Sequence, residues 1–135
     1  MLMHKDITDR ILKAFYQVYQ DLGYGFLERI YEMAMLMKTR ELGLRVQRQV
    51  PIDVYYEGEK IGRYAADLVV NELIIVEIKA ARALCEENEA QLLNYLRATQ
   101  FEVGLLLNFG YRSEVRRFVF GNDRKGTRNT RINAD

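Results

Sequence analysis

Apolar residues recur every three or four positions over the first 42 residues of the chain. The recurrence is clear over residues 7–22 and again over 27–42, and this spacing is typical of amphipathic helices. Between the two segments, the stretch "DLGYG" supplies turn residues, and Gly43 stands where a second helix can end in a left-handed conformation. The beginning of the chain is therefore predicted to form two helices joined by a short turn.

From residue 45 the pattern becomes typical of strands. Apolar and polar residues alternate first, and two segments rich in β-branched residues follow. Pro51 lacks the amide hydrogen that a sheet needs, so the first strand is expected to lie at an edge or to contain a bulge. The three predicted strands cover residues 45–58, 60–70 and 73–80.

The rest of the chain adds one helix and two short strands. Residues 86–99 return to helical spacing, and residues 102–110 and 115–120 have the composition of strands. The order ααβββαβ, with a further terminal strand, predicts a single α/β domain over residues 1–120, followed by a polar basic tail over 121–135. A chain of 135 residues that is 49% hydrophobic has the size and apolar content of one domain.

The formal net charge of +1 conceals a basic C-terminal end. Residues 112–135 contain seven Arg or Lys residues against three acids, which leaves about −3 on the preceding part. Such a segment is usually a solvated surface, and it is also able to contact phosphates. The single cysteine, Cys85, excludes an intramolecular disulfide, and no N-terminal apolar run resembles a signal peptide or a membrane span. We expect a cytoplasmic protein without a membrane partner.

Three ionisable side chains interrupt the predicted apolar strands. Asp67 breaks the run "YAADLVV", and Glu77 and Lys79 follow in "VEIKA". Ionised groups beside an apolar sheet are costly unless they are paired or bound to a metal. Because side chains alternate along a strand, Glu77 and Lys79 share a face, and an antiparallel neighbour would bring Asp67 to the same place. We therefore predict that two carboxylates and an ammonium group converge.

The turn between these two strands decides whether the three groups meet. A two-residue turn at Asn71-Glu72 would pair Asp67 with Val76, on the face away from Glu77. A three-residue turn over 71–73 would set Asp67 directly opposite Glu77, with Cβ atoms about 5 Å apart. Convergence thus predicts a three-residue turn or a β-bulge that corrects the parity.

The predicted cluster suits a hard divalent cation. Mg²⁺ prefers carboxylate oxygens, keeps several waters and is often held by one or two acids together with substrate phosphate. A bound ion lowers the pKa of its water and neutralises charge on a phosphate, and a nearby lysine can orient the attacking water. The alternative interpretation is a structural ion-pair cluster, because short motifs recur by chance. The single histidine, His4, gives little support to a histidine-based zinc site.

Two sequence motifs resemble a known group of nucleases. Asp67, nine intervening residues and then Glu77-Ile78-Lys79 are similar to the motif of the PD-(D/E)xK nuclease superfamily. Gly25-x-x-Glu28-x-x-Tyr31 resembles the signature of the GxxExxY family within that superfamily. The blocks "YAADLVV", "VEIKA", "EAQLLNYL" and "GLLLNFG" also resemble this family, and the likeness covers about residues 5 to 120. Four ordered blocks are more specific than any one of them.

The resemblance implies a fold and a metal site. The implied fold is restriction-endonuclease-like, with a mixed sheet of four or five strands flanked by helices. Asp67 and Glu77 would hold Mg²⁺, for which Mn²⁺ would substitute, together with Glu28 from the first helical region and the backbone carbonyl of Ile78. Lys79 would be the catalytic lysine. The alternative for Glu28 is simple stabilisation of a helix N-terminus by an acid in its first turn.

The same resemblance implies that Gln91 and Tyr95 position the nucleotide. These two residues are four apart and share a helical face, so a half-buried polar pair beside leucines is the alternative. Two positions depart from the superfamily pattern. Ala66 stands where the superfamily has proline, and Asn88 stands where many relatives have histidine.

The sequence thus predicts a metal-dependent nuclease that hydrolyses nucleic-acid phosphodiester bonds, with DNA expected rather than RNA. The alternative is a catalytically inactive module with the nuclease fold that binds nucleic acid or a protein partner. No separate recognition domain is visible in the sequence, so a homodimer or a partner chain is expected to supply specificity.

Overall fold

The structure is a computed structural model that describes residues 2–125. Two helices lead into a five-stranded sheet, a third helix interrupts the strands, and a 3₁₀ turn follows them, which confirms the predicted order of elements and the terminal fifth strand. The elements are α1 (Lys5–Leu22), α2 (Glu28–Glu41), β1 (Val46–Tyr56), β2 (Glu59–Val70), β3 (Ile74–Lys79), α3 (Glu86–Ala98), β4 (Val103–Phe109), β5 (Ser113–Val119) and η1 (Asn122–Arg124).

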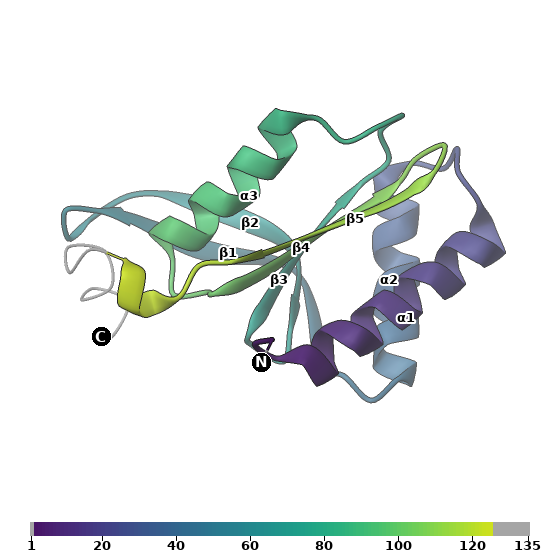
Figure 1. The fold of residues 1–135 in the computed structure, drawn as a ribbon, viewed down its shortest axis with the longest axis horizontal. Coiled ribbons are helices and arrows are strands. Elements are labelled where there is room, and N and C mark those ends of the chain that lie inside the picture. Colours follow the sequence, from purple (N-terminus) through teal and green to yellow (C-terminus); the bar gives the residue numbers. More distant parts are fainter. Residues whose placement is uncertain (1, 126–135) are drawn as a thin grey trace.

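The sheet lies between two layers of helix, with α1 and α2 on one face and α3 on the other (Figure 1). The larger core cluster joins α1 and α2 to one face of the sheet, and Phe15, Tyr31 and Phe109 are among its fully buried side chains. The smaller cluster places Leu92 and Leu96 of α3 against the opposite face. Within residues 2–125, no helix combines the length and the apolar character needed to cross a membrane.

The strands are arranged in the order β1-β2-β3-β4-β5, and only β3 and β4 are parallel. Helix α3 makes the crossover that a parallel pair requires. Strand β1 is an edge strand, which confirms the position expected from Pro51, and its register with β2 shifts between Val54 and Tyr55. The mixed sheet flanked by helices agrees with the predicted restriction-endonuclease-like fold.

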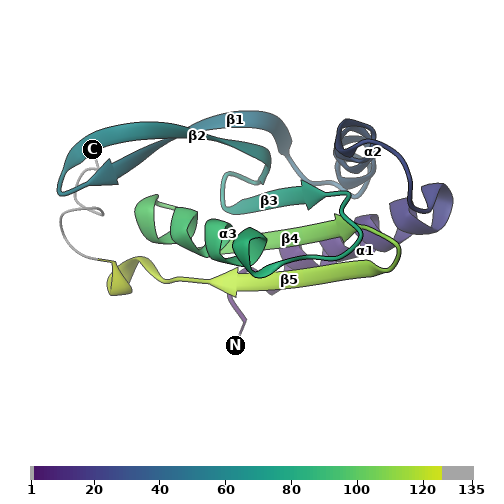
Figure 2. The same cartoon turned by 90° about the horizontal axis from the view of Figure 1, so that it is seen from above.

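The β1–β2 hairpin bends near its middle, and residues before and after the bend pack against different faces of the sheet. The hairpin arches away from the rest of the sheet (Figure 2). Leu68 packs in the cluster of α1 and α2, whereas Ala66, two residues earlier, packs in the cluster of α3. In a straight strand, residues two apart face the same side. The bend coincides with Gln49, which has a φ of 50° and lies where Asp67 would be paired in the ladder. Asp67 therefore occupies the corner of a bent hairpin.

The turn between β2 and β3 has three residues. Val70 pairs with Ile74 and Leu68 pairs with Val76, so residues 71–73 form the turn. Asn71 and Glu72 both have positive φ values, of 51° and 58°. This register confirms the predicted odd turn, and its continuation by one residue sets Asp67 opposite Glu77.

Tyr31 fixes the loop that joins α1 to α2. Its hydroxyl donates to the carbonyl of Gly23 at 2.6 Å and accepts from the amide of Phe26 at 3.2 Å. Its ring stacks on Phe109, with centroids 4.2 Å apart. The tyrosine at the end of the Gly25-x-x-Glu28-x-x-Tyr31 motif is thus fully buried and has a structural task.

Replacing Tyr31 with phenylalanine is expected to lower the free energy of unfolding by about 1–2 kcal/mol, because the amide of Phe26 and the carbonyl of Gly23 lose their partner while the ring stacking stays. Chemical denaturation of both proteins measures the difference. A variant as stable as the parent would contradict this role of the hydroxyl.

Arg116 and Lys125, two cations of the basic C-terminal end that lie among the described residues, are bound within the fold. Arg116 faces Glu89 and Glu114, and Nζ of Lys125, which is only 8% exposed, donates to the carbonyls of Thr99 and Phe101. Burial lowers the pKa of Lys125 to about 8. The predicted boundary at residue 120 stays a prediction, and residues 126–135 of the expected tail lie outside the described part.

Candidate active site

Asp67 and Glu77 meet where strands β2 and β3 stop pairing. The backbone amide of Asp67 donates to Oε2 of Glu77 at 3.2 Å, and the backbone amide of Ile78 donates to Oδ2 of Asp67 at 2.8 Å. Each carboxylate is therefore bound by the main chain of the opposite strand. The bend at Asp67 opens the sheet at this point and leaves the two acids together at the fork.

Tyr64 holds the Glu77 side chain from the other side. Its hydroxyl donates a short hydrogen bond to Oε2 of Glu77. Burial and the neighbouring Glu77 raise the pKa of Tyr64, so the hydroxyl keeps its proton and remains a donor. No described residue donates a hydrogen bond to Oε1 of Glu77. One oxygen of this carboxylate is fixed, and the other is free for a ligand.

Burial, followed by the charge of Asp67, raises the pKa of Glu77 from 4.5 to about 7. The hydrogen bonds from Tyr64 and from the Asp67 amide act in the opposite direction, as does the charge of Lys79. Without a bound cation, the Glu77 carboxyl therefore retains its proton up to near-neutral pH. A divalent cation placed between the two acids would remove this cost of ionisation.

The stability of the metal-free protein is expected to fall between about pH 4.5 and pH 7 because of Glu77. The folded protein holds this proton up to about pH 7, whereas the unfolded chain releases it near pH 4.5, so raising the pH favours unfolding. The raised pKa of Glu77 corresponds to a decrease of roughly 3 kcal/mol in the free energy of unfolding across this pH range. Urea denaturation across this range in EDTA, compared with Glu77→Gln, measures it, and an equal pH slope in both proteins would contradict the raised pKa.

Lys79 lies two residues beyond Glu77 in a regular strand and therefore on the same face. It pairs in register with Asn108 of β4 at the end of the parallel ladder, and its side chain is partly exposed. Its charge acts on Glu77, although its ammonium group makes no hydrogen bond or ion pair with any residue in the range 2–125. The ammonium group of Lys79 is therefore near the acids and available to interact with a ligand.

Two residues that the sequence did not suggest, Glu32 and Gln49, join the site from the other side. The amide nitrogen of Gln49 donates to Oε1 of Glu32 at 2.9 Å and to Oδ1 of Asp67 at 3.3 Å. Glu32 is only 6% exposed, and Arg48 faces it at 3.4 Å. The left-handed backbone of Gln49 is uncommon for a residue other than glycine, and residues in such conformations cluster at functional sites.

The predicted helical acid, Glu28, is the first residue of α2 and is exposed. No described contact joins it to Asp67 or Glu77. Glu32 follows it by four residues, so the two acids lie one turn apart on the same side of the helix. The sequence signal for Glu32 was an acid among residues that the helix buries, next to Tyr31 and before Met35. A metal-binding role for Glu28 stays a prediction.

Helix α3 carries Gln91 and Tyr95 over the opposite side of the site. The ring of Tyr95 stacks on that of Tyr64, with centroids 3.6 Å apart, so Tyr95 supports the donor that holds Glu77. Gln91 is exposed one turn earlier and is free to meet a ligand. Asn88 closes a capping box with Cys85 at the start of α3. The nucleotide-positioning roles of Gln91 and Tyr95 stay predictions.

The donor set fits a hard divalent cation. Asp67 and Glu77 provide hard oxygen ligands, and no imidazole or thiolate lies among their described contacts, which favours Mg²⁺ or Mn²⁺ over Zn²⁺. Within residues 2–125, no group of three or more His, Cys, Asp or Glu residues is placed to hold one ion. Two carboxylates suffice for Mg²⁺, which keeps several waters and binds substrate phosphate.

Comparisons with known proteins agree with this geometry. A family model described as the PD-(D/E)XK nuclease superfamily matches residues 5–118. Proteins of this superfamily typically use divalent metals. Neither a curated protein nor a solved structure matched the chain. The matched range contains all five strands and the three α-helices apart from the last residue of β5.

Proposed function

Because the chain belongs to the PD-(D/E)XK nuclease superfamily, we propose that it is a metal-dependent nuclease that hydrolyses phosphodiester bonds of nucleic acid, with DNA as the expected substrate. The observation that carries this proposal is the meeting of Asp67 and Glu77 at the fork between β2 and β3, with Lys79 on the Glu77 face. We also assign the chain to the GxxExxY family on its motif, and to the cytoplasm.

In this proposal Asp67 and Glu77 hold Mg²⁺, with the carbonyl of Ile78 as a further oxygen donor. The ion, when bound, would supply Lewis acidity at the phosphate and a water of lowered pKa. Tyr64 and the Asp67 amide orient Glu77, while the Ile78 amide and Gln49 orient Asp67. Ligands fixed in this way need little rearrangement when the ion binds.

Lys79 is proposed to act in the chemical step. The oxygen of a water forms a bond to phosphorus, one ester bond to phosphorus breaks, and the leaving alcohol oxygen receives a proton. The Lys79 ammonium orients the attacking water or stabilises the negative charge that develops on the phosphoryl oxygens. Gln91 and Tyr95 are proposed to position the nucleotide beside it.

The direct test is a cleavage assay on labelled single-stranded and double-stranded DNA and RNA, with Mg²⁺ or with EDTA. Cleavage is expected with the ion only, and Asp67→Asn is expected to lose at least about a hundredfold in rate. Asp53→Asn is the matched control, because Asp53 pairs with Lys60 and Arg63 in the hairpin arm. A parent protein that cuts none of these substrates would favour the inactive binding module, and equal cleavage with Mg²⁺ and with EDTA would contradict the metal dependence.

A further inference from the structure

Two adjoining cavities lie beyond the carboxyl ends of the parallel strands β3 and β4. One has a volume of about 350 Å³ and is lined by residues of the α1–α2 loop, the segment after β3 and the β4–β5 turn. The other has a volume of about 530 Å³ and is lined by residues 82–83 and 111–114. Both cavities are lined by Arg82 and Tyr111, so they adjoin at these two residues, and the pair of cavities is called the cleft. Ligands of sheets with parallel strands bind beyond such strand ends.

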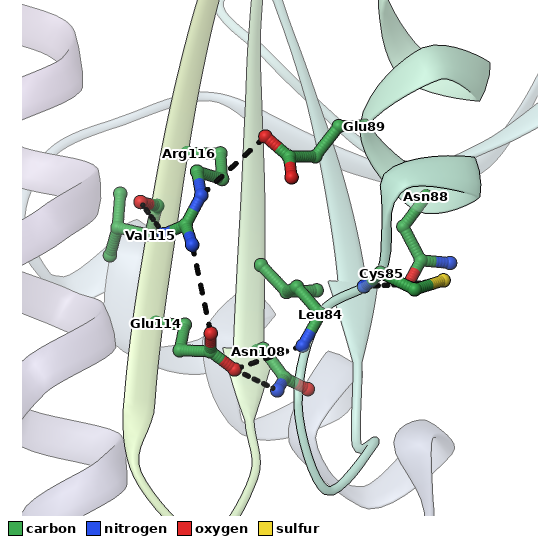
Figure 3. Close-up of polar contacts among 8 residues, drawn as sticks. All are labelled: Leu84, Cys85, Asn88, Glu89, Asn108, Glu114, Val115 and Arg116. Carbon is green, nitrogen blue, oxygen red and sulfur yellow. Dashed lines mark hydrogen bonds and ion pairs between the residues drawn. The ribbon is translucent and has the colours of Figure 1, made fainter.

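The cleft carries positive charge that the fold does not use. Arg82 and Arg112 line it and are exposed. Neither forms an ion pair or a hydrogen bond with another residue in the part of the chain that the structure describes. Figure 3 shows that Glu114, the acid of this cleft, accepts from Leu84 and Asn108 and faces Arg116. The carboxylate of Glu114 therefore already has partners within the fold, whereas the guanidinium groups of Arg82 and Arg112 are available to bind an anion.

Two exposed aromatic rings stand on the same cleft. Tyr24 is 58% exposed and Tyr111 is 65% exposed, and their ring centroids lie 5.1 Å apart. Exposed aromatic rings beside unpaired arginines are the elements with which proteins bind single-stranded nucleic acid, because the rings stack on bases and the cations meet phosphates. A duplex offers no free base faces to such rings, since its bases stack on one another.

The walls of the cleft are fixed in advance. The hydroxyl of Tyr19 lies 2.9 Å from the carbonyl oxygens of both Gly110 and Tyr111, and Tyr31 holds the loop that carries Tyr24. Asn108, which is fully buried, donates to the carbonyl of Ala81 and accepts from its amide, both at 2.9 Å. A site that is already ordered loses little entropy when its ligand binds.

The close approach of the two strand ends adds to this rigidity. A Cβ atom at Gly110 would lie 2.2 Å from the carbonyl oxygen of Ala81, so a side chain at this position would push the walls apart. Ala80 and Ala81 line the cleft and directly follow Lys79 in the chain. The Cα atom of Ala81 is therefore at most about 7 Å from that of Lys79, the proposed catalytic lysine.

We propose that this cleft binds an unpaired segment of nucleic acid next to the scissile phosphate, with bases stacked on Tyr24 and Tyr111 and phosphates beside Arg82 and Arg112. The proposal rests on the proposed function for the nature of the ligand and extends it to the form of the substrate. A strand with a single-stranded part, such as a flap or an overhang, is then bound in preference to a continuous duplex.

The test measures affinity for short labelled oligo(dT), oligo(U) and a blunt duplex by fluorescence anisotropy in EDTA, where no metal-dependent cleavage occurs. Tyr111→Ala is expected to lower the affinity for single strands roughly tenfold and to change duplex affinity much less. Arg82→Ala is expected to weaken binding and to lower the slope of log affinity against log salt by about 0.7. If these two substitutions lower the affinity for oligo(dT) more than the affinity for oligo(U), the cleft is assigned to DNA. The reverse result assigns it to RNA.

Three further variants serve as controls for these affinity measurements. Tyr111→Phe keeps the ring and is expected to bind like the parent, while Tyr16→Ala and Arg10→Ala are exposed controls on α1 outside the cleft. Unchanged binding by Tyr111→Ala, an equal loss for single strands and duplex, or no binding of single strands by the parent would overturn the proposal. Because binding is measured without metal, failure here is distinct from a failure of cleavage.

Discussion

Replacing Lys79 with alanine is expected to lower the rate of phosphodiester cleavage by about a hundredfold to ten-thousandfold and to leave substrate affinity nearly unchanged. The ammonium group lies on the face of Glu77 and makes no hydrogen bond or ion pair within residues 2–125, so its removal leaves the fold intact. Affinity for phosphates is spread over many basic residues and changes little when one is lost.

Single-turnover cleavage and metal-free binding of the same oligonucleotide measure the two effects of Lys79→Ala separately. Lys13→Ala is the matched control, since Lys13 is an exposed lysine on α1. Loss of cleavage and of binding in equal proportion would show that Lys79 serves binding alone, and an unchanged cleavage rate would remove it from the chemical step.

Replacing Asp67 with asparagine is expected to abolish stabilisation of the fold by Mn²⁺. A ligand present at 100 times its Kd adds about 2.7 kcal/mol to the free energy of unfolding, which corresponds to a rise in Tm on the order of 10 °C for a chain of this size. The parent is expected to show this rise, because the ion relieves the unfavourable ionisation of Glu77 beside Asp67. Asp67→Asn removes one of the two charged ligands.

Thermal melts with and without Mn²⁺ measure this effect, and Asp53→Asn again serves as the control outside the site. The rise for the parent is expected to be larger at pH 8 than at pH 6, because the ion must displace the proton of Glu77 at the lower pH. Equal rises for the parent and for Asp67→Asn would place the ion elsewhere.

The register at the centre of the site was predictable from parity alone. Side chains alternate along a regular strand, so a shared site for Asp67 and Glu77 predicted an odd turn or a β-bulge, and residues 71–73 form an odd turn. The helices were equally predictable, because α1 and α2 each bury one face and Gly43 ends α2 with a φ of 87°. These features depend on local spacing.

The support around the two acids was not predictable, because it depends on a bend in the β1–β2 hairpin. Alternation places Ala66 and Leu68 on one face, whereas the bend at Gln49 sends them into different cores. The same bend brings Gln49 between Glu32 and Asp67. No local pattern indicates that Gln49 adopts a left-handed conformation. The family resemblance pointed to Glu28, whereas the acid that contacts Gln49 is Glu32, one turn further along α2.

Tyr64 and the basic C-terminal end illustrate the same limit. Tyr64 lies three residues before Asp67, and its hydrogen bond to Glu77 and its stacking on Tyr95 are tertiary contacts that local spacing does not indicate. The sequence favoured a solvated basic segment at the end of the chain, but Arg116 and Lys125 are bound within the fold and Arg112 lines the cleft. Tertiary contacts decide which charges remain available to a ligand.

The most direct measurement of the central claim is anomalous diffraction from crystals soaked with Mn²⁺. A manganese peak is expected within about 2–2.5 Å of carboxylate oxygens of both Asp67 and Glu77, with Lys79 on the same side of the sheet. The same soak of Asp67→Asn crystals is expected to lose the peak. A clean map of the parent with no manganese at these two carboxylates, or with the ion bound only elsewhere, would contradict the metal-dependent active site.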